Sequence, residues 1–223
     1  MRGVPSILFD LDGTLLDTLD DLADAMNASL ADEGLPTHAV DAYRYFVGDG
    51  VDMLARRSAG AAADDPARFA RLVAGQRRHY REGWKRKTRP YPGIDRMLAG
   101  LAARKANLAV LSNKPDDFTR LIIAEYFPGD PFIQVRGARG DVPRKPDPAG
   151  ALAIARAVGV EPGGWLYLGD TDTDMKTAVA AGMRPLGAGW GFRPASELLG
   201  AGATAVLARP EAMLEAAFAG KSG

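Results

Sequence analysis

The chain lacks three features that would each point to a class of protein. It contains no cysteine, which excludes disulfides, thiol nucleophiles and thiolate metal sites and fits a reducing cytosol. Its 28 lysines and arginines balance 28 aspartates and glutamates, so its charge does not favour nucleic acid or an anionic membrane as a partner. No apolar run approaches the roughly 18 residues that span a bilayer, and no signal-peptide core precedes the first acidic residues. We therefore expect a cytoplasmic protein that binds neither nucleic acid nor membranes.

The sequence does contain enough apolar residues for a large core. With 223 residues, 47% of them apolar, it fits one large domain or one domain that carries a smaller insert. From Leu15 to Leu30, apolar residues recur at helical spacing with aspartates between them, and helical patterns continue to Trp84 without a strand-like run. The pattern predicts a small all-helical domain over residues 16–85, inserted into a core formed by residues 1–15 and 86–223.

The rest of the chain alternates between strand-like and helical patterns after the turn signal Tyr91-Pro92-Gly93. This alternation predicts an α/β core, a doubly wound parallel sheet with helices on both faces. The expected strands after that turn are Leu108–Leu111, Phe132–Val135, Trp165–Leu168 and Ala205–Leu207, and the expected helices are Asp95–Arg104, Asp116–Tyr126, Pro148–Val158 and Asp174–Ala181.

The first strand of this core ends in two carboxylates. Ile7-Leu8-Phe9 is a buried strand pattern that runs directly into Asp10-Leu11-Asp12-Gly13. Because side chains alternate along a strand, Asp10 and Asp12 are expected to point to the same side. One of the two could then attack a substrate while the other moves protons.

Polar residues also follow two later strands, and ligands bind at the carboxyl ends of strands in such sheets. Asp170 would join Asp10 and Asp12 in an oxygen-rich cluster, which favours a hard cation such as Mg²⁺. The Ser112 hydroxyl, the Asn113 backbone N–H and the Lys145 ammonium are candidate phosphate donors. These groups together suit phosphoryl transfer, which requires charge to be neutralised on the transferring oxygens.

Four segments carry a resemblance to a known family. They are Asp10-Leu11-Asp12-Gly13-Thr14, Ser112-Asn113-Lys114, Lys145-Pro146-Asp147-Pro148, and Gly169-Asp170-Thr171 through Asp174-Met175. In this order they resemble the four motifs of the haloacid dehalogenase-like (HAD) hydrolases, most closely the phosphoglycolate phosphatase group. The resemblance implies a Rossmann-like core, with the helical insert as a small cap domain.

The resemblance also implies roles for individual residues. Asp10 would be the nucleophile that forms an aspartyl-phosphate, and Asp12 would protonate the leaving oxygen and later activate water. Mg²⁺ would bind the Asp10 carboxylate, the Asp12 backbone carbonyl and Asp170. Ser112, Asn113 and Lys145 would hold the phosphoryl group, and Asp174 would orient Lys145 or a metal-bound water. In the cap, the turn Gly48-Asp49-Gly50 would contact the substrate.

The function that follows is a Mg²⁺-dependent phosphatase of a small phosphorylated metabolite, with 2-phosphoglycolate as the first substrate to test. A sugar-phosphate mutase similar to β-phosphoglucomutase would share every core residue named above. A phosphonate hydrolase would need a cap lysine placed for Schiff-base chemistry. The candidates Lys85 and Lys87 lie near the hinge where the chain returns to the core, which disfavours this function. A non-catalytic phosphate-binding module on the same fold is the alternative from another class, although it need not retain Asp10 and Asp12 together.

Overall fold

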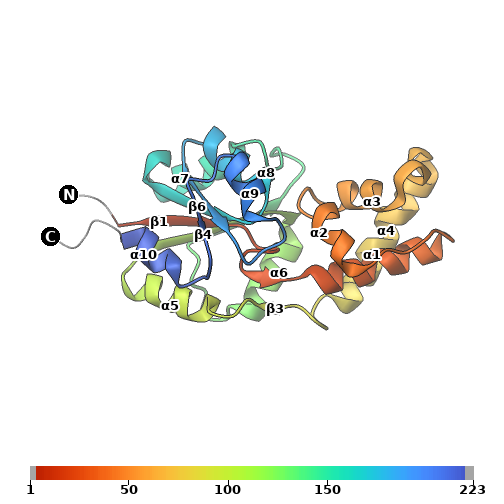
Figure 1. Ribbon diagram of the computed structural model, residues 1–223, viewed down its shortest axis with the longest axis horizontal. Coiled ribbons are helices and arrows are strands. Elements are labelled where there is room, and N and C mark those ends of the chain that lie inside the picture. The colour runs from red at the N-terminus through yellow and green to blue at the C-terminus, as the bar shows by residue number, and fades with distance from the viewer. Residues whose placement is uncertain (1–3, 219–223) are drawn as a thin grey trace. The chain divides into compact units, whose positions relative to one another are not determined.

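The computed structural model describes residues 4–218, and the chain divides into two units (Figure 1). The core unit comprises Met1–Leu16 and Pro90–Gly223, and the helical unit comprises Asp17–Arg89. The second boundary lies at Arg89 rather than at residue 85. The reason is a pair of short strands, β2 (Leu16–Asp17) and β3 (Arg89–Pro90), which form a two-stranded sheet where the chain leaves and re-enters the core unit.

The core unit contains a six-stranded sheet with the order β5-β4-β1-β6-β7-β8, and all of its strand pairs are parallel. Strand β1 lies between β4 and β6, and all four of its residues are buried, as expected for a strand covered on both faces. The strands are β1 (Ser6–Phe9), β4 (Asn107–Pro115), β5 (Gln134–Ala138), β6 (Trp165–Gly169), β7 (Arg184–Ala188) and β8 (Ala205–Leu207).

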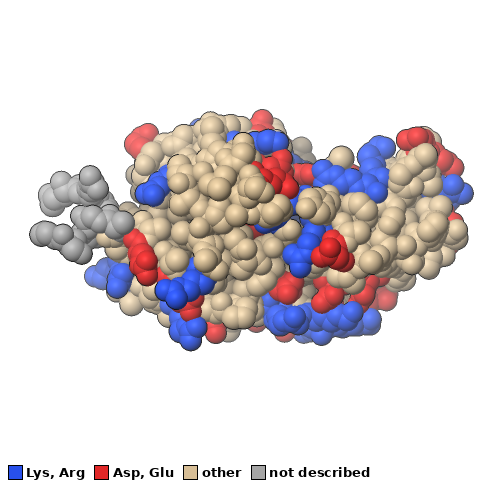
Figure 2. Space-filling model, in the orientation of Figure 1, with Lys and Arg blue, Asp and Glu red and all other residues tan. Residues whose placement is uncertain are grey.

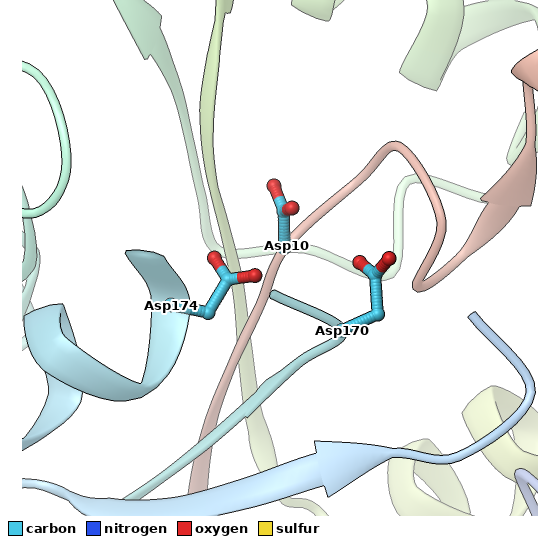
Figure 3. A group of neighbouring side chains, drawn as sticks. All are labelled: Asp10, Asp170 and Asp174. Carbon is cyan, nitrogen blue, oxygen red and sulfur yellow. The ribbon is translucent and has the colours of Figure 1, made fainter. Parts of the chain in front are cut away.

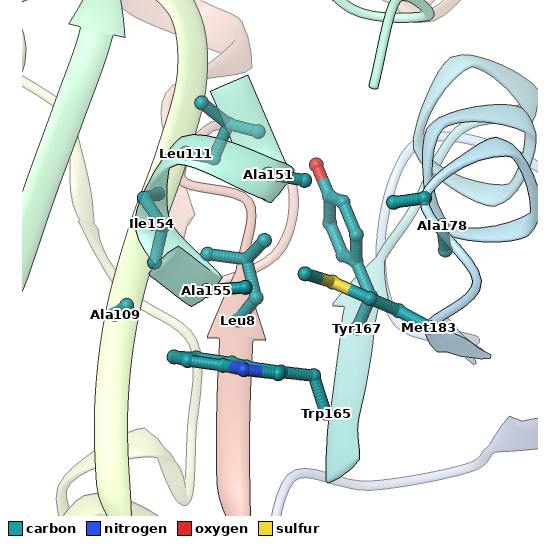
Figure 4. Close-up of a cluster of buried hydrophobic side chains, with 11 residues drawn as sticks. Leu8, Ala109, Leu111, Ala151, Ile154, Ala155, Trp165, Tyr167, Ala178 and Met183 are labelled. Carbon is teal, nitrogen blue, oxygen red and sulfur yellow. The ribbon is translucent and has the colours of Figure 1, made fainter. Parts of the chain in front are cut away.

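Helices cover both faces of this sheet. On one face, Leu8, Trp165 and Tyr167 pack against side chains of α7 and α8 in a cluster of buried hydrophobic residues (Figure 4). On the other face, Phe9 contacts the ring of Phe132, which in turn contacts Phe127 at the end of α6. The helices of the core unit are α5 (Ile94–Ala103), α6 (Asp116–Tyr126), α7 (Ala149–Val158), α8 (Asp172–Ala180), α9 (Ala195–Gly200) and α10 (Ala212–Phe218), with a 3₁₀ turn at Pro162–Gly164.

The observed core is the expected doubly wound α/β sheet, with three differences in the strands. Strand β4 was predicted at Leu108–Leu111 but continues to Pro115. Strand β7 is not predicted by the sequence pattern, because its segment Arg-Pro-Leu-Gly-Ala contains a proline and a glycine, and proline is rarely found inside a sheet. Strand β5 was predicted at Phe132–Val135 but begins at Gln134. Phe132 lies before the strand, because its ring fills the space between Phe9 and Phe127.

The helical unit is built around the packing of α1 against α4. Leu22, Met26 and Leu30 lie on the buried face of α1, and Leu72 of α4 is fully buried. Helix α4 begins with Pro66 after Asp65, whose carboxylate accepts hydrogen bonds from the first free N–H groups. The elements are α1 (Leu19–Asp32), a 3₁₀ turn at Val40–Ala42, α2 (Tyr43–Phe46), α3 (Val51–Ala59), a 3₁₀ turn at Gly60–Asp64, and α4 (Pro66–Gly83).

The surface carries charges of both signs. Figure 2 shows Lys and Arg side chains next to Asp and Glu side chains over the visible face, in keeping with the balanced composition. Among residues 4–218, no helix combines the length and the apolar character that a membrane crossing requires.

Candidate active site

The candidate site lies at the carboxyl ends of β1, β4 and β6. Phe9, the last residue of β1, pairs with Val110 of β4 and with Leu168 of β6, so the residues that follow emerge at the same edge of the sheet. Asp10 N donates to Leu168 O at 3.0 Å, which continues the pairing by one residue. The parallel register therefore brings the Asp10 and Asp170 segments together although they are far apart in sequence.

Three buried carboxylates form the centre of the site. Asp10, Asp170 and Asp174 each offer an oxygen within 4.8 Å of the others, and Figure 3 shows the three carboxylate groups directed to the same side. The sequence predicts the side chain of Asp12 in this cluster, but the third carboxylate is Asp174 from the first turn of α8. Asp12 lies beyond the end of β1, where the alternation of a strand no longer fixes the direction of its side chain.

Lys145 lies among these carboxylates and is itself buried. Its ammonium is 2.8 Å from Oδ1 of Asp10 and 2.7 Å from Oδ1 of Asp174. Burial by itself lowers the pKa of Lys145, but the two carboxylates raise it well above its ordinary value. Burial and the nearby Asp174 raise the pKa of Asp10, against the opposing effect of Lys145. The lysine is therefore held as a cation beside Asp10.

Asp170 is fixed by the turn that follows β1 and by the loop after β7. Thr14 Oγ1 donates to Oδ1 of Asp170 at 2.8 Å, and Phe192 N donates to Oδ2 at 2.9 Å. Burial and the Asp174 charge raise the pKa of Asp170 to about 7. Gly13 has a φ of +84° and passes so close that a Cβ there would lie 2.2 Å from Oδ2 of Asp170. Both the positive φ and the close approach to Asp170 therefore require a glycine at position 13.

Asp174 is oriented by its own helix. Its Oδ2 accepts hydrogen bonds from the backbone N–H and the hydroxyl of Thr171, and Thr171 Oγ1 accepts from Asp174 N, which forms a capping box at the start of α8. Its Oδ1 accepts from Lys145 Nζ and, at 3.4 Å, from the Tyr167 hydroxyl. The geometry suits a residue that orients Lys145, the first of the two roles that the resemblance implies.

The charge of this cluster fits a divalent cation. Three buried carboxylates surround one ammonium, and burial, together with the charge of neighbouring carboxylates, raises the pKa of Asp10 and of Asp170. A hard cation with oxygen ligands, such as Mg²⁺, would offset that charge. Asp10 and Asp170 are the two carboxylates of the cluster that the resemblance assigns to this cation, whereas Asp174 belongs to the capping box of α8.

The predicted phosphate donors lie next to Lys145. Ser112 and Asn113 are buried residues of β4. The Asn113 amide donates to Lys145 O at 3.1 Å and accepts from Lys145 N at 2.9 Å, so it anchors the loop that carries the lysine. This places Ser112 and Lys145 on neighbouring segments at one edge of the sheet.

Asp12 is held by a second lysine. Lys114 Nζ donates to Oδ1 of Asp12 at 2.7 Å, and the side chain of Lys114 is only 6% exposed. Lys114 belongs to the Ser112-Asn113-Lys114 motif, but the sequence assigns it no role. The sequence offered no signal for this contact, because β4 is irregular between Leu111 and Pro115 and the alternation of a strand does not fix the direction of Lys114 there.

The remaining candidates lie outside this cluster. Gly48, Asp49 and Gly50 belong to the helical unit, where Asp49 forms an ion pair with Arg57. Their contact with a substrate stays a prediction. Asp172, which the sequence left without a role, pairs with Lys176 on the outer side of α8 and is not part of the carboxylate group.

The core is a parallel sheet with buried acids and a lysine at its carboxyl edge, and a helical unit is inserted in the chain after the first strand. This combination is typical of a class of α/β hydrolases. Comparison with known proteins gives the family. The model of the haloacid dehalogenase-like hydrolases matches residues 7–188. The chain therefore belongs to this family of hydrolases.

Its relatives include proteins named phosphoglycolate phosphatase. The protein of that name from Rhodospirillum rubrum is 37% identical over 197 residues, which is 84% of this chain and 80% of the relative. The one from Thiobacillus denitrificans is 32% identical over 201 residues, 87% of this chain and 88% of the relative. A crystal structure of a predicted phosphoglycolate phosphatase from Haemophilus somnus 129pt has a TM-score of 0.88 at 26% identity and covers 96% of this chain and 97% of its own. The enzyme class of this chain is accordingly that of the phosphoric monoester hydrolases.

Proposed function

We propose that this enzyme is a Mg²⁺-dependent phosphatase of small phosphomonoesters, with 2-phosphoglycolate as its first candidate substrate. The observation that carries the proposal is the position of the Lys145 ammonium between Asp10 and Asp174, with Asp170 beside them. The names of the relatives support the choice of substrate. The cysteine-free composition fits a reducing compartment, and we place the activity in the cytoplasm.

Asp10 is the proposed nucleophile. A carboxylate oxygen of Asp10 attacks phosphorus and forms an aspartyl-phosphate, and water then hydrolyses this intermediate. The Lys145 ammonium and the Ser112 hydroxyl bind the oxygens of the phosphoryl group as its charge is redistributed, together with the Asn113 backbone N–H. Because Asn113 holds the Lys145 loop by two hydrogen bonds, these donors are fixed before the substrate arrives.

Asp12 is the proposed acid and base. It gives a proton to the leaving oxygen in the first step and accepts one from the attacking water in the second. Its carboxylate is held apart from the cluster of Asp10, Asp170 and Asp174, so it can move protons without competing for the cation.

Mg²⁺ would bind the carboxylates of Asp10 and Asp170 and the backbone carbonyl of Asp12. When bound, it supplies positive charge that stabilises the transferring phosphoryl oxygens. The helical unit would act as the cap, and its turn Gly48-Asp49-Gly50 would contact the part of the substrate beyond the phosphate. Both glycines have positive φ, +123° and +87°, so the turn depends on them.

The test is phosphate release from a panel of small phosphomonoesters that includes 2-phosphoglycolate, measured with Mg²⁺ and with a chelator. We expect metal-dependent release that falls by about 10³-fold or more in Asp10→Asn, since this change removes the nucleophile. Asp117→Asn is the matched control, because Asp117 is an exposed aspartate of α6 outside the site, and it should retain the parent activity.

The other functions predict different results in the same assay. Isomerisation of glucose 1-phosphate without phosphate release would identify a sugar-phosphate mutase. Folded protein that turns over none of the esters would point to a binding module. Either result would overturn the proposed phosphatase.

A further inference from the structure

Lys114 is a buried cation that forms an ion pair with the side chain of Asp12. The two side chains are 6% and 13% exposed, and the ammonium donates to Oδ1 of Asp12 at 2.7 Å. Lysine is rarely buried unless its charge is paired, because removal of an ammonium from water is costly. An ion pair that spans 102 residues of sequence at this depth is therefore a specific feature of the site.

The two buried lysines of the site serve different carboxylates. Lys145 contacts Asp10 and Asp174, and Lys114 contacts Asp12. The backbone of Lys114 is anchored as well: its N–H donates to Ser112 Oγ at 3.2 Å, and its carbonyl accepts from Thr119 Oγ1 at 3.2 Å. The ammonium is therefore presented to Asp12 from a fixed segment at the junction of β4 and α6.

The contact also leaves part of the Asp12 carboxyl group available. Lys114 reaches Oδ1, and among residues 4–218 no side-chain hydrogen bond reaches Oδ2. One oxygen is thus held in place while the other can carry the proton that is transferred.

We propose that Lys114 is a positioning residue that acts through Asp12, and this inference rests on the proposed phosphatase function. Lys114 holds the Asp12 carboxyl group in the orientation for proton transfer and stabilises the negative charge that Asp12 acquires when it gives up its proton. It does not act on the phosphoryl group, which is the role of Lys145.

The chemical step shows where this charge forms. An oxygen of Asp10 bonds to phosphorus, the bond from phosphorus to the ester oxygen breaks with its electron pair on that oxygen, and the proton of Asp12 moves there to give the alcohol. Asp12 is left as a carboxylate beside the Lys114 ammonium. In the second step water bonds to phosphorus and gives its proton to Asp12, and the bond from Asp10 to phosphorus breaks. The sum is one ester and one water converted to one alcohol and one phosphate.

The test compares two leaving groups in Lys114→Met. An alkyl ester such as 2-phosphoglycolate needs a proton on its leaving oxygen, whereas the nitrophenolate of 4-nitrophenyl phosphate leaves as a stable anion. We measure kcat/KM at saturating Mg²⁺, because this ratio covers only the steps up to departure of the leaving group. We expect a fall of about 10²-fold for the alkyl ester and of less than about threefold for the aryl ester, since general-acid catalysis contributes roughly 10²–10⁴-fold.

Two further variants keep the test decisive. In an Asp12→Asn background, Lys114→Met should change kcat/KM for the alkyl ester by less than about twofold, because residues that act as a unit are not additive. Lys114→Arg retains the charge and should recover most of the alkyl-ester activity. Lys114→Gln, which also removes the charge, replaces the Met variant with the same expected result if that protein does not fold. Arg96→Met is the matched control: it removes an exposed ion pair with Glu211 in the same unit and should leave both ratios unchanged.

The results separate the two proposals. If the parent enzyme hydrolyses neither ester, the phosphatase function fails. If the parent hydrolyses both and Lys114→Met lowers the two kcat/KM values by the same factor, or if the effect persists in the Asp12→Asn background, the role of Lys114 is overturned.

Discussion

At the scale of single residues, the site is dominated by an excess of buried negative charge. Asp10, Asp170 and Asp174 surround Lys145, and burial together with mutual repulsion raises the pKa of Asp10 and of Asp170. Such an arrangement is unfavourable for the folded protein unless a cation or a proton offsets the charge. The same charge that we propose to bind Mg²⁺ is therefore expected to link metal binding to stability.

This linkage can be measured with Asp170→Asn. A ligand present at about 100 times its Kd stabilises the folded state by about 2.7 kcal/mol. For a protein of this size we expect Mg²⁺ to raise the Tm of the parent enzyme by about 5 °C or more. Asp170→Asn removes one carboxylate ligand, so the same Mg²⁺ concentration should produce little shift. An equal Tm shift in both proteins would show that Asp170 does not bind the metal.

A second residue-scale prediction concerns Gly13. In Gly13→Ala the new Cβ would overlap Oδ2 of Asp170 at a backbone φ of +84°, so either the turn or the carboxylate must move. We expect a loss of phosphatase activity of about 10²-fold, because small displacements of catalytic groups have effects of this size. Gly129→Ala, where nothing lies within 4 Å of the added Cβ, should retain activity. Full activity of Gly13→Ala would contradict the close approach.

At the scale of the elements, the start of α6 is tied to the edge strand β5 through one carboxylate. Asp116 accepts a hydrogen bond from Gly137 N at 2.8 Å and pairs with Arg120 and Arg139. Burial opposes ionisation, but the arginines and the N–H group prevail and lower the pKa of Asp116 to about 2. The contact therefore stabilises the fold only while Asp116 is ionised.

The sign of the pH dependence follows from this lowered pKa. The unfolded chain binds a proton at Asp116 near its ordinary value of 3.8, and the folded protein does so near 2, so the stabilisation is complete above about pH 5 and is lost as the pH falls through that window. Because both arginines are half exposed, we expect a contribution of about 1 kcal/mol. Urea unfolding should show that Asp116→Asn lowers the free energy of unfolding by this amount at pH 6 and by less at pH 3. An equal loss at both values would contradict the assignment.

At the scale of the whole molecule, the chain consists of two units joined by two connections. Every residue proposed to bind the metal or the phosphoryl group lies in the core unit, and the predicted substrate turn lies in the helical unit. Each unit also has its own buried apolar residues, such as Leu8 in the core unit and Leu72 in the helical unit. The proposed function thus places metal binding in the core unit and substrate selection in the helical unit.

This division can be tested with Leu72→Ala. Loss of a fully buried leucine between α1 and α4 is expected to destabilise the helical unit by about 2–5 kcal/mol. The Kd for Mg²⁺, measured by calorimetry below the unfolding transition, should stay within about twofold of the parent value, because no proposed ligand lies in that unit. A large change in Mg²⁺ affinity would show that the helical unit contributes to the metal site.

The sequence by itself determined the class of fold, the family and the segments that carry the chemistry. The apolar run before Asp10 identified the central strand, and the motifs with Ser112, Lys145 and Asp170 identified the residues at the sheet edge. Local patterns suffice for this, because strand burial and helical periodicity are properties of short segments. Strand β7 was not predicted, because a segment with a proline and a glycine does not have the pattern of a buried strand.

The tertiary structure alone decided where the side chains go. It brought Asp174 rather than the carboxylate of Asp12 to Asp10 and Asp170, and it paired Asp12 with Lys114 across 102 residues. Beyond the end of a strand the direction of a side chain depends on the turn and on the charges that meet it. Those partners come from distant segments that the parallel sheet brings together. Their spacing along the chain therefore does not predict which side chains will be in contact.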